Sequence, residues 1–307
     1  MNFSSMEYFV TLAQERSFTK AADRLHITQQ TLSTHIANLE NELGSKLIVR
    51  HIPLELTFAG TVFLRYASGF QRDRSRLERE FCDITQNQKG LLRIGIAFTR
   101  GRTILPRVIV AFQKEYPNIT VELSEASNDV LHQMLLNGEI DIGIADFPDS
   151  FQGITLKDYY REEIVLLIAR SLFTDLLLEK STVCEKRLRE GDLSVLKDFP
   201  FLLESEKHIE GKIGRRFLSN AGIVLPFIKA TSSNMTTLLE LCVLGSGACF
   251  CPENLARAVL TKKQFDDLLL LRLGKEAVYQ IRFGYHSDEY QWSVMDAFMD
   301  CARHIIH

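Results

Sequence analysis

Near the start of the chain, apolar residues recur at the spacing of helices. One stripe predicts a helix over residues 3–15, and its members are Met6, Phe9, Val10 and Ala13. A second stripe, in steps of four, three and four residues, predicts a longer helix that starts at Thr28; it consists of Leu32, Ile36, Leu39 and Leu43. Thr28 is a favourable N-cap residue because its hydroxyl can accept a hydrogen bond from an unpaired backbone N–H.

A shorter predicted helix lies between these two, and a tight turn containing His26 joins it to the longer one. Ala21, Ala22 and Leu25 share one face of it, where small side chains let another helix cross closely. Opposite its apolar stripe, the longer helix has a polar face: Gln29, Gln30, Ser33, Thr34, His35 and Asn38. These side chains can bond to base edges and phosphates if the helix enters the major groove. The alternative interpretation is a helical bundle with a solvated polar face.

A long helix is predicted from about residue 58 to residue 87. Its apolar residues repeat every seven positions, at Phe63, Phe70, Leu77 and Ile84, with intermediate seam positions Ala67, Arg74 and Phe81. Such a helix would be about 45 Å long. The seam favours pairing with a second copy, and packing against the chain's own domain is the alternative. Arg74 on the seam should oppose tight packing or pair with a carboxylate.

The pattern changes at Lys89-Gly90, after which short apolar strands alternate with helices. Strands are predicted at 91–96, 119–123, 140–145, 163–169, 201–203, 226–230, 248–251, 268–273 and 278–286, and helices at 103–116, 128–137, 209–221, 233–244 and 290–306. This alternation predicts an α/β fold with a parallel sheet and helices on both of its faces. Residues 173–199, rich in leucine and charge, have no functional interpretation.

Composition sets outer limits on the function. A chain of 307 residues can hold two or three domains, and 46% apolar with 24% charged residues is ordinary for a soluble protein. No apolar run is long enough for a bilayer, and the start lacks a secretory signal, so we expect a cytoplasmic protein. The six cysteines show no zinc-ligand spacing and are expected to be reduced, buried hydrophobes. No metal, cofactor or catalytic cluster is predicted.

The net charge of −3 argues weakly against nucleic-acid binding. The first sixty residues contain five Lys or Arg and six Asp or Glu, a sum of −1, so they do not supply a basic patch. Any DNA affinity must then come from a few well-placed charges, from helix N-termini and from dimerisation.

The order of residues in this region nevertheless resembles the LysR-type transcriptional regulators of bacteria. The resemblance rests on Ser17-Phe18-Thr19-Lys20-Ala21-Ala22, Leu25-His26-Ile27-Thr28-Gln29, Leu32-Ser33, Glu42-Leu43-Gly44, Leu56-Thr57 and Ala59-Gly60. It continues through Leu105-Pro106, Tyr116-Pro117, Gly138-Glu139-Ile140-Asp141-Ile142-Gly143-Ile144 and Gly245-Ser246-Gly247. It therefore covers nearly the whole chain.

The resemblance implies three parts. Residues 1–58 would form an all-α winged helix-turn-helix that binds double-stranded DNA, with a wing around Arg50. Residues 59–89 would form a linker helix that holds a homodimer, and dimers would pair into tetramers that bend DNA. Residues 90–307 would form a bilobal domain like a periplasmic binding protein, with lobe I from 91–161 and 269–307 and lobe II from 162–268. Candidate DNA contacts also include Ser17, Thr19, Lys20, Thr28 and Thr31, and RNA polymerase is a further candidate partner.

In open α/β sheets, ligands bind beyond the carboxyl ends of the strands. The loop 98–103 follows the first strand and precedes a predicted helix start, where backbone N–H groups can hold an anion. Candidate effector contacts at such loop ends are Thr99, Arg100, Arg102, Thr103, Asn128, Glu204, Ser205 and Thr231. Solvent exposure or a subunit contact is an equal alternative for the two arginines. Hydroxyls with a guanidinium suit a small organic anion.

Two rival functions stay open. One is an enzyme that uses the bilobal fold to bind its substrate, although no catalytic constellation is visible. The other is a regulator switched by cysteine oxidation, with Cys249 and Cys251 on one face of a strand as the nearest pair. That spacing gives poor disulfide geometry, so buried thiols are the preferred interpretation.

Overall fold

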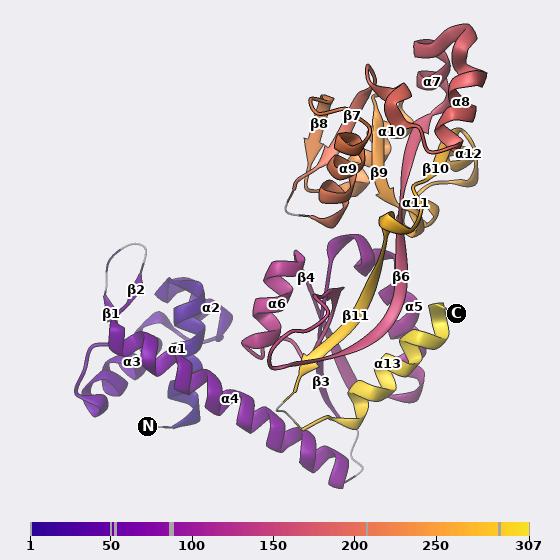
Figure 1. Ribbon diagram of the computed structural model, residues 1–307. Helices are drawn as coiled ribbons and strands as arrows, with labels where there is room; N and C mark the ends of the chain where they lie inside the picture. The colour runs from indigo at the N-terminus through magenta and orange to yellow at the C-terminus, as the bar shows by residue number, and fades with distance from the viewer. Residues whose placement is uncertain are drawn as a thin grey trace. The chain divides into compact units, whose positions relative to one another are not determined.

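The computed structural model describes residues 2–49, 51, 54–85, 89–206, 208–287 and 290–306. The chain divides into two compact units, Met1–Gln88 with Glu289–Trp292, and Lys89–Asp288 with Ser293–His307. The first unit is mainly helical, and the second combines strands with helices (Figure 1). Among the described residues, none of the helices is long and apolar enough to cross a membrane.

Four helices and a short hairpin make up the first unit. They are α1 Phe3–Glu15, α2 Phe18–Arg24, α3 Gln29–Leu43, β1 Ile48–Val49, β2 Glu55–Leu56 and α4 Phe58–Ile84. Each helix begins after a side chain that accepts a backbone N–H: Asn2, Ser17, Thr28 and Thr57. The predicted helix-turn-helix, with Thr28 as N-cap, is confirmed. His26 lies in the turn with a positive φ of 55°.

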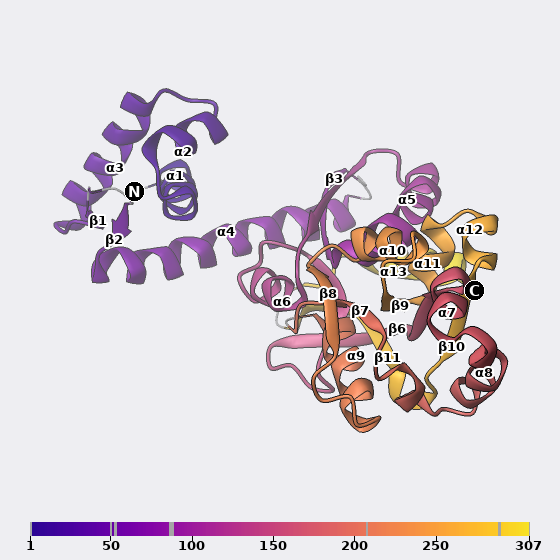
Figure 2. The ribbon, with the colours of Figure 1, turned by 90° about the horizontal axis from the view of Figure 1, so that it is seen from above.

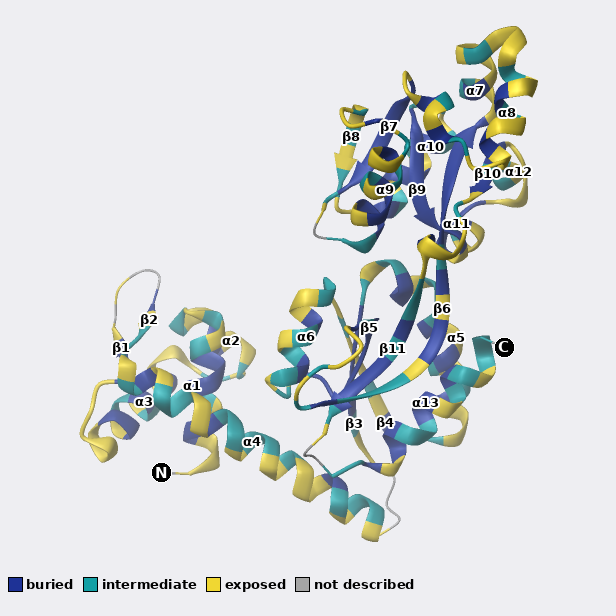
Figure 3. Cartoon of the chain, viewed as in Figure 1, coloured by how far each residue is buried: buried dark blue, intermediate teal, exposed yellow. Residues whose placement is uncertain are grey.

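The long helix α4 is unbroken in both views (Figures 1 and 2). The first part of its heptad seam packs within its own unit: the Phe63 ring meets Phe9 edge-on at 5.0 Å, and Ala67 is buried beside Met6 and Val10. The rest is exposed, with Phe70 45%, Leu77 56% and Ile84 68% accessible (Figure 3). Packing against the chain's own unit is thus confirmed for the first part of the seam, and pairing of the exposed part with a second copy stays a prediction. The end of the predicted helix, residues 86–87, lies outside the described residues.

A buried carboxylate attaches the hairpin to α3. The Glu40 side chain is only 2% exposed. Its Oε1 accepts hydrogen bonds from the backbone N–H of Leu47 at 2.9 Å and of Ile48 at 3.4 Å. Its Oε2 accepts a hydrogen bond from Lys46 Nζ at 2.7 Å. Burial alone would raise the pKa of Glu40, but these bonds and the lysine charge lower it below its usual 4.5. Gly60 completes this junction, because a Cβ there would lie 2.0 Å from the Leu47 carbonyl oxygen.

The second unit is built on a mixed sheet, not the fully parallel sheet that was predicted. Its strands are β3 Gly90–Ile96, β4 Ile119–Glu125, β5 Ile142–Asp146, β6 Ile154–Ala169, β7 Pro200–Glu204, β8 Phe227–Ser232, β9 Ala248–Pro252, β10 Leu268–Arg272 and β11 Val278–His286. The order is β4-β3-β5-β11-β6-β9-β7-β8, and β10 also pairs with β6. Pairs within β3–β5 and within β7–β9 are parallel, whereas every pair that involves β6 or β11 is antiparallel.

Strand β6 belongs to both lobes. Its residues 154–163 pair with β11 in lobe I, and residues 164–169 pair with β9 and β10 in lobe II. Strand β10 pairs with β6 in lobe II, so the chain returns to lobe I only after Arg272. The expected boundary between the lobes, at 268/269, is therefore too early. Alternate β6 side chains enter two cores of lobe II, with Ile164 on one face and Val165 on the other.

Helices cover both faces of this sheet, as predicted. They are α5 Phe98–Glu115, α6 Asn128–Leu136, α7 Arg170–Leu177, α8 Ser181–Arg189, α9 Ile209–Asn220, α10 Met235–Val243, α11 Glu253–Val259, α12 Lys262–Asp266 and α13 Ser293–Ile306, with 3-10 turns at Leu178–Lys180, Leu193–Leu196 and Lys275–Ala277. Residues 173–199 have a structural role, because Phe173, Cys184, Leu188, Leu196 and Phe199 enter one lobe II core.

We predict that Glu40→Ala loosens the hairpin, because the buried N–H groups of Leu47 and Ile48 lose their acceptor, at a cost of about 1–3 kcal/mol. Folding lowers the pKa of Glu40. Its contribution to the free energy of unfolding is therefore complete above pH 4.5 and disappears as the pH falls through the pKa of the folded state. Hydrogen exchange at these two amides should therefore quicken at pH 7 in Glu40→Ala but not in Glu42→Ala, an exposed carboxylate of the same helix. Equal exchange in the two variants would contradict this role.

Candidate functional site

The polar start of α3 is exposed, as expected for a surface that reads DNA. Gln29, Gln30, Thr31, Thr34 and Asn38 are all exposed. The Thr28 hydroxyl accepts the Thr31 N–H at 3.1 Å, and the Thr34 hydroxyl donates to the Gln30 carbonyl at 2.9 Å, which leaves the two glutamine amides as the most adaptable groups. Ser33 is half-buried.

His35 and the α2 candidates have additional structural roles. The His35 ring packs edge-on against Tyr8 with centroids 4.9 Å apart, so it supports the contact between α1 and α3. Ser17 is the N-cap of α2 and accepts the Lys20 N–H at 3.4 Å, while the side chains of Thr19 and Lys20 are exposed. Arg50, the candidate of the wing, lies outside the described residues.

The second candidate site is a cavity of about 410 Å³ between the two lobes of the second unit. Lobe I contributes Ala97, Phe98, Thr99, Arg100, Arg102, Glu125, Ala126, Ser127 and Asn128, and lobe II contributes Glu204, His208, Ile209, Glu210, Ser233, Asn234, Met235 and Thr236. The structure thus brings together five of the predicted effector residues: Thr99, Arg100, Arg102, Asn128 and Glu204. A larger hollow of about 580 Å³ lies beside α7 and α8, where Glu185 already pairs with Arg170 and Arg189.

The other three predicted residues do not line this cavity. Helix α5 starts at Phe98, earlier than the sequence predicted, so Thr103 is in its second turn and its hydroxyl donates to the Arg100 carbonyl. Strand β8 runs to Ser232, so the cavity meets Ser233 and Asn234 and not Thr231. Ser205, at the end of β7, is also outside the lining.

Among the described residues, the N-termini of α5, α6, α9 and α10 line the cavity. The N-cap residues of α5 and α6, Ala97 and Ser127, make no side-chain capping bond, so the first backbone N–H groups there face the cavity without a cap. These backbone N–H groups give this end of the cavity the capacity to bind an anionic group. Asn128 lies beside them, and its buried Oδ1, an acceptor, has no hydrogen-bond partner among the described residues, so a ligand there would also need a donor.

Arg100 lines the cavity but is neither solvent-exposed nor an unpaired cation, which corrects the interpretation that it is exposed. It is 1% exposed and donates to Glu162 Oε2 through Nε at 3.0 Å and Nη2 at 2.9 Å. Arg100 Nη2 also donates to the Tyr279 hydroxyl at 3.0 Å. The Tyr279 hydroxyl in turn donates to Glu162 Oε2, and the Tyr160 hydroxyl donates to Glu162 Oε1. Burial would lower the pKa of Arg100, but the Glu162 charge raises it well above its usual value.

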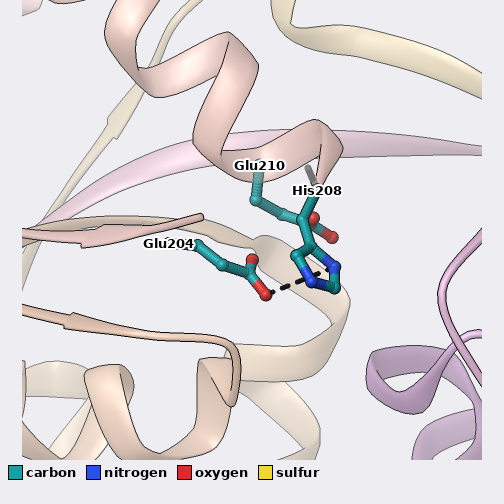
Figure 4. A group of neighbouring side chains, drawn as sticks. All are labelled: Glu204, His208 and Glu210. Carbon is teal, nitrogen blue, oxygen red and sulfur yellow. Dashed lines mark ion pairs between the residues drawn. The ribbon is translucent and has the colours of Figure 1, made fainter. Parts of the chain in front are cut away.

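The lobe II end of the cavity is acidic. Glu204 and Glu210 are 3% and 4% exposed, and the His208 Nδ1 lies 3.6 Å from Glu204 Oε1 (Figure 4). Burial, then the nearby Glu210, raise the pKa of Glu204 to about 9. Burial also raises the pKa of Glu210, against the opposing charge of Arg100.

Sequence reasoning missed most of this network. Glu162, Tyr160 and Tyr279 come from the two crossing strands, and nothing in local spacing shows that these strands meet under α5. His208 and Glu210 had an available signal, the spacing Glu-x3-His-x-Glu from Glu204. Four of the six cysteines are buried as expected, Cys184, Cys242, Cys249 and Cys251, whereas Cys82 and Cys301 are only half-buried, which corrects the prediction for those two. Cys249 and Cys251 are fully buried, and the pKa of each thiol is raised well above its usual value, which disfavours the reactive thiolate.

A winged helix-turn-helix joined to a bilobal ligand-binding fold defines a class of DNA-binding regulators. Residues 3–61 match the family described as bacterial regulatory helix-turn-helix protein, lysR family, and residues 85–305 match the LysR substrate binding domain. The chain belongs to the LysR family of transcriptional regulators.

Individual relatives agree with this assignment. The uncharacterized HTH-type transcriptional regulator YcgK of Bacillus subtilis is 27% identical over 99% of this chain and 94% of its own. Full-length CbnR complexed with its target DNA has a similar fold, with a TM-score of 0.64, 24% identity and 99% of each chain covered. Full-length OxyR from Pseudomonas aeruginosa has a TM-score of 0.71 at 21% identity, covering 99% of this chain and 95% of its own. YcgK and CbnR are named as transcriptional regulators.

We predict that removing one partner of the Arg100–Glu162 pair destabilises the second unit strongly. Arg100→Met leaves Glu162 buried without its cation, and the loss should be about 3–5 kcal/mol in urea unfolding followed by circular dichroism. Adding Glu162→Gln to Arg100→Met removes the stranded charge and should restore a large part of that loss. Arg102→Met, an exposed neighbour, should change the unfolding free energy by less than about 0.5 kcal/mol. A double variant no more stable than the single one would contradict the pairing argument.

Proposed function

We propose that this regulator reads operator DNA with the first turns of α3 and changes its hold on that DNA when a small molecule occupies the interlobe cavity. The observation that carries the DNA part is the exposed polar start of α3, opposite a buried stripe of Leu32 and Ile36. An exposed glutamine amide can make a bidentate contact with adenine in the major groove. Lys20 and the α3 N-terminus would add contacts to the backbone phosphates.

The assembly proposed is a homodimer through α4, with two dimers forming a tetramer. Phe70, Leu77, Phe81 and Ile84 share one stripe of α4, and each is at least 45% exposed in the single chain. Four large apolar side chains on one stripe favour burial against a partner. Arg74 within this stripe pairs with Glu78 of its own helix at 3.0 Å, so its charge is balanced before a partner arrives.

The effector proposed is a small molecule with an acidic group. That group would lie at the N-termini of α5 and α6, with the Thr99 hydroxyl and the Asn128 amide as donors. The charge of Arg100 is already balanced by Glu162, so the backbone amides and Arg102 would supply the attraction. Because the cavity lining comes from both lobes, a ligand that prefers one lobe arrangement would shift its population and so the spacing and bending of bound DNA.

We predict that Gln29→Ala weakens operator binding or relaxes the preference at one base pair, by about 1–3 kcal/mol if a bidentate contact is lost. The measurement is a mobility-shift titration against operator variants at fixed salt. Asn41→Ala, exposed near the other end of α3, serves as the control and should bind like the parent. Unchanged binding of Gln29→Ala to every operator variant would remove Gln29 from the reading surface.

We also predict that Phe70→Asp combined with Leu77→Asp dissociates dimers held by α4, because the new charges would be buried without partners in the interface. Sedimentation velocity on the full chain should show the change to a smaller species. The control is Arg65→Asp combined with Arg76→Asp, two exposed positions off the apolar stripe. If the stripe variant keeps the parent's sedimentation coefficient, α4 is not the interface.

A further inference from the structure

Three metal-binding side chains meet at the lobe II end of the cavity. Glu204 ends β7, His208 is the N-cap of α9, and Glu210 is in its first turn. One ligand atom from each lies within 4.8 Å of those of the other two. Figure 4 shows the three side chains gathered at the junction of this strand and this helix.

The local backbone holds these residues together. A Cβ at Gly211 would lie 2.3 Å from the Ser205 carbonyl oxygen and 2.7 Å from that of Glu204, so glycine allows the first turn of α9 to approach the end of β7. Arg215 Nη1 then donates to the carbonyls of Glu204 at 2.7 Å and Gly211 at 3.2 Å. The cluster is therefore built on a fixed junction of two regular elements.

One carboxylate oxygen of the cluster is buried without a partner. Glu204 is 3% exposed, and its Oε2 has no hydrogen-bond partner among the described residues. The nearby cation, Arg100, has both its bonds to carboxylate directed at Glu162. Two buried carboxylates carry a charge of −2 when both are ionised, and a buried charge without a partner is costly.

We propose that Glu204, His208 and Glu210 bind one divalent transition-metal ion such as Zn²⁺ or Mn²⁺. One imidazole nitrogen and two carboxylates suit these ions, whereas Mg²⁺ and Ca²⁺ prefer oxygen ligands alone. Ligands on a tetrahedral zinc ion lie about 3.3 Å apart, so the side chains need only small rotations to close on it. A charge of +2 balances the pair of carboxylates.

Three protein ligands leave a coordination position open, as in zinc sites that bind a further molecule. Since all three residues line the cavity, that position would face whatever the cavity holds. The metal site does not depend on the proposed DNA contacts or on the identity of the effector, so each can be tested without the other.

The test uses the full chain, dialysed against a chelator and then against metal-free buffer. Calorimetric titration with MnCl2 and with ZnCl2 should each show one ion bound per chain. Glu204→Gln, His208→Asn and Glu210→Gln should each weaken binding at least 100-fold, since even residues that only support metal ligands are worth about 10–100-fold. Manganese is the more discriminating probe because cysteine thiolates, of which this chain could supply six, are poor ligands for it.

The matched control is Glu125→Gln, which removes a carboxylate from the same cavity but outside the cluster, and its affinity for manganese should stay within twofold of the parent. Thermal unfolding separates lost binding from lost folding: manganese should raise the melting temperature of the parent and of Glu125→Gln, and not that of the cluster variants. Absence of manganese and zinc binding by the parent would overturn the proposal. Equal affinity in parent and cluster variants would overturn it too, by placing the ion elsewhere.

Discussion

The buried ion pair between Arg100 and Glu162 determines how the effector-binding unit is assembled. It attaches the first turn of α5, in lobe I, to the strands that cross into lobe II. The Tyr160 hydroxyl donates to the other oxygen of the carboxylate, and the Tyr279 hydroxyl donates to the oxygen that Arg100 bonds. A buried pair of this kind contributes little net stability compared with an apolar pair, but it is costly to break. Its main consequence is geometric, because it fixes where the α5 N-terminus opens into the cavity.

This pair also sets the charge distribution within the cavity. The guanidinium that the sequence offers as an anion ligand is already balanced, so attraction for an anion must come from backbone amides at helix starts and from Arg102. On the other side, Arg100 bonds Glu162 and neither Glu204 nor Glu210, and burial with the nearby Glu210 raises the pKa of Glu204 to about 9. The two ends of the cavity therefore differ in charge preference. One end suits a negatively charged group, and the other suits a positively charged group.

The sequence predicted most of the elements because their signals are local. Thr28 as a cap and the stripe of Leu32 and Ile36 depend on neighbours within one or two turns, and the structure confirms them. The mixed sheet was not predicted, because the direction in which β6 and β11 pair depends on contacts more than a hundred residues apart. The pairing of Arg100 was not predicted for the same reason, since its partner Glu162 is 62 positions away. Its helix also starts without a capping side chain, so no local signal marks the helix start at Ala97.

A cavity with opposite charge preferences at its two ends restricts the ligand more than either end does alone. A simple dicarboxylate would place one charge at the amides of α5 and α6 and the other beside Glu204 and Glu210, whose carboxyl groups cannot balance a second negative charge. A divalent ion at the carboxylates reverses that preference, because its open position attracts a second acidic group. With the ion in place the cavity suits a dianion, and without it a ligand with one acidic and one cationic group. Occupancy of the metal site would thus decide which class of small molecule the regulator senses.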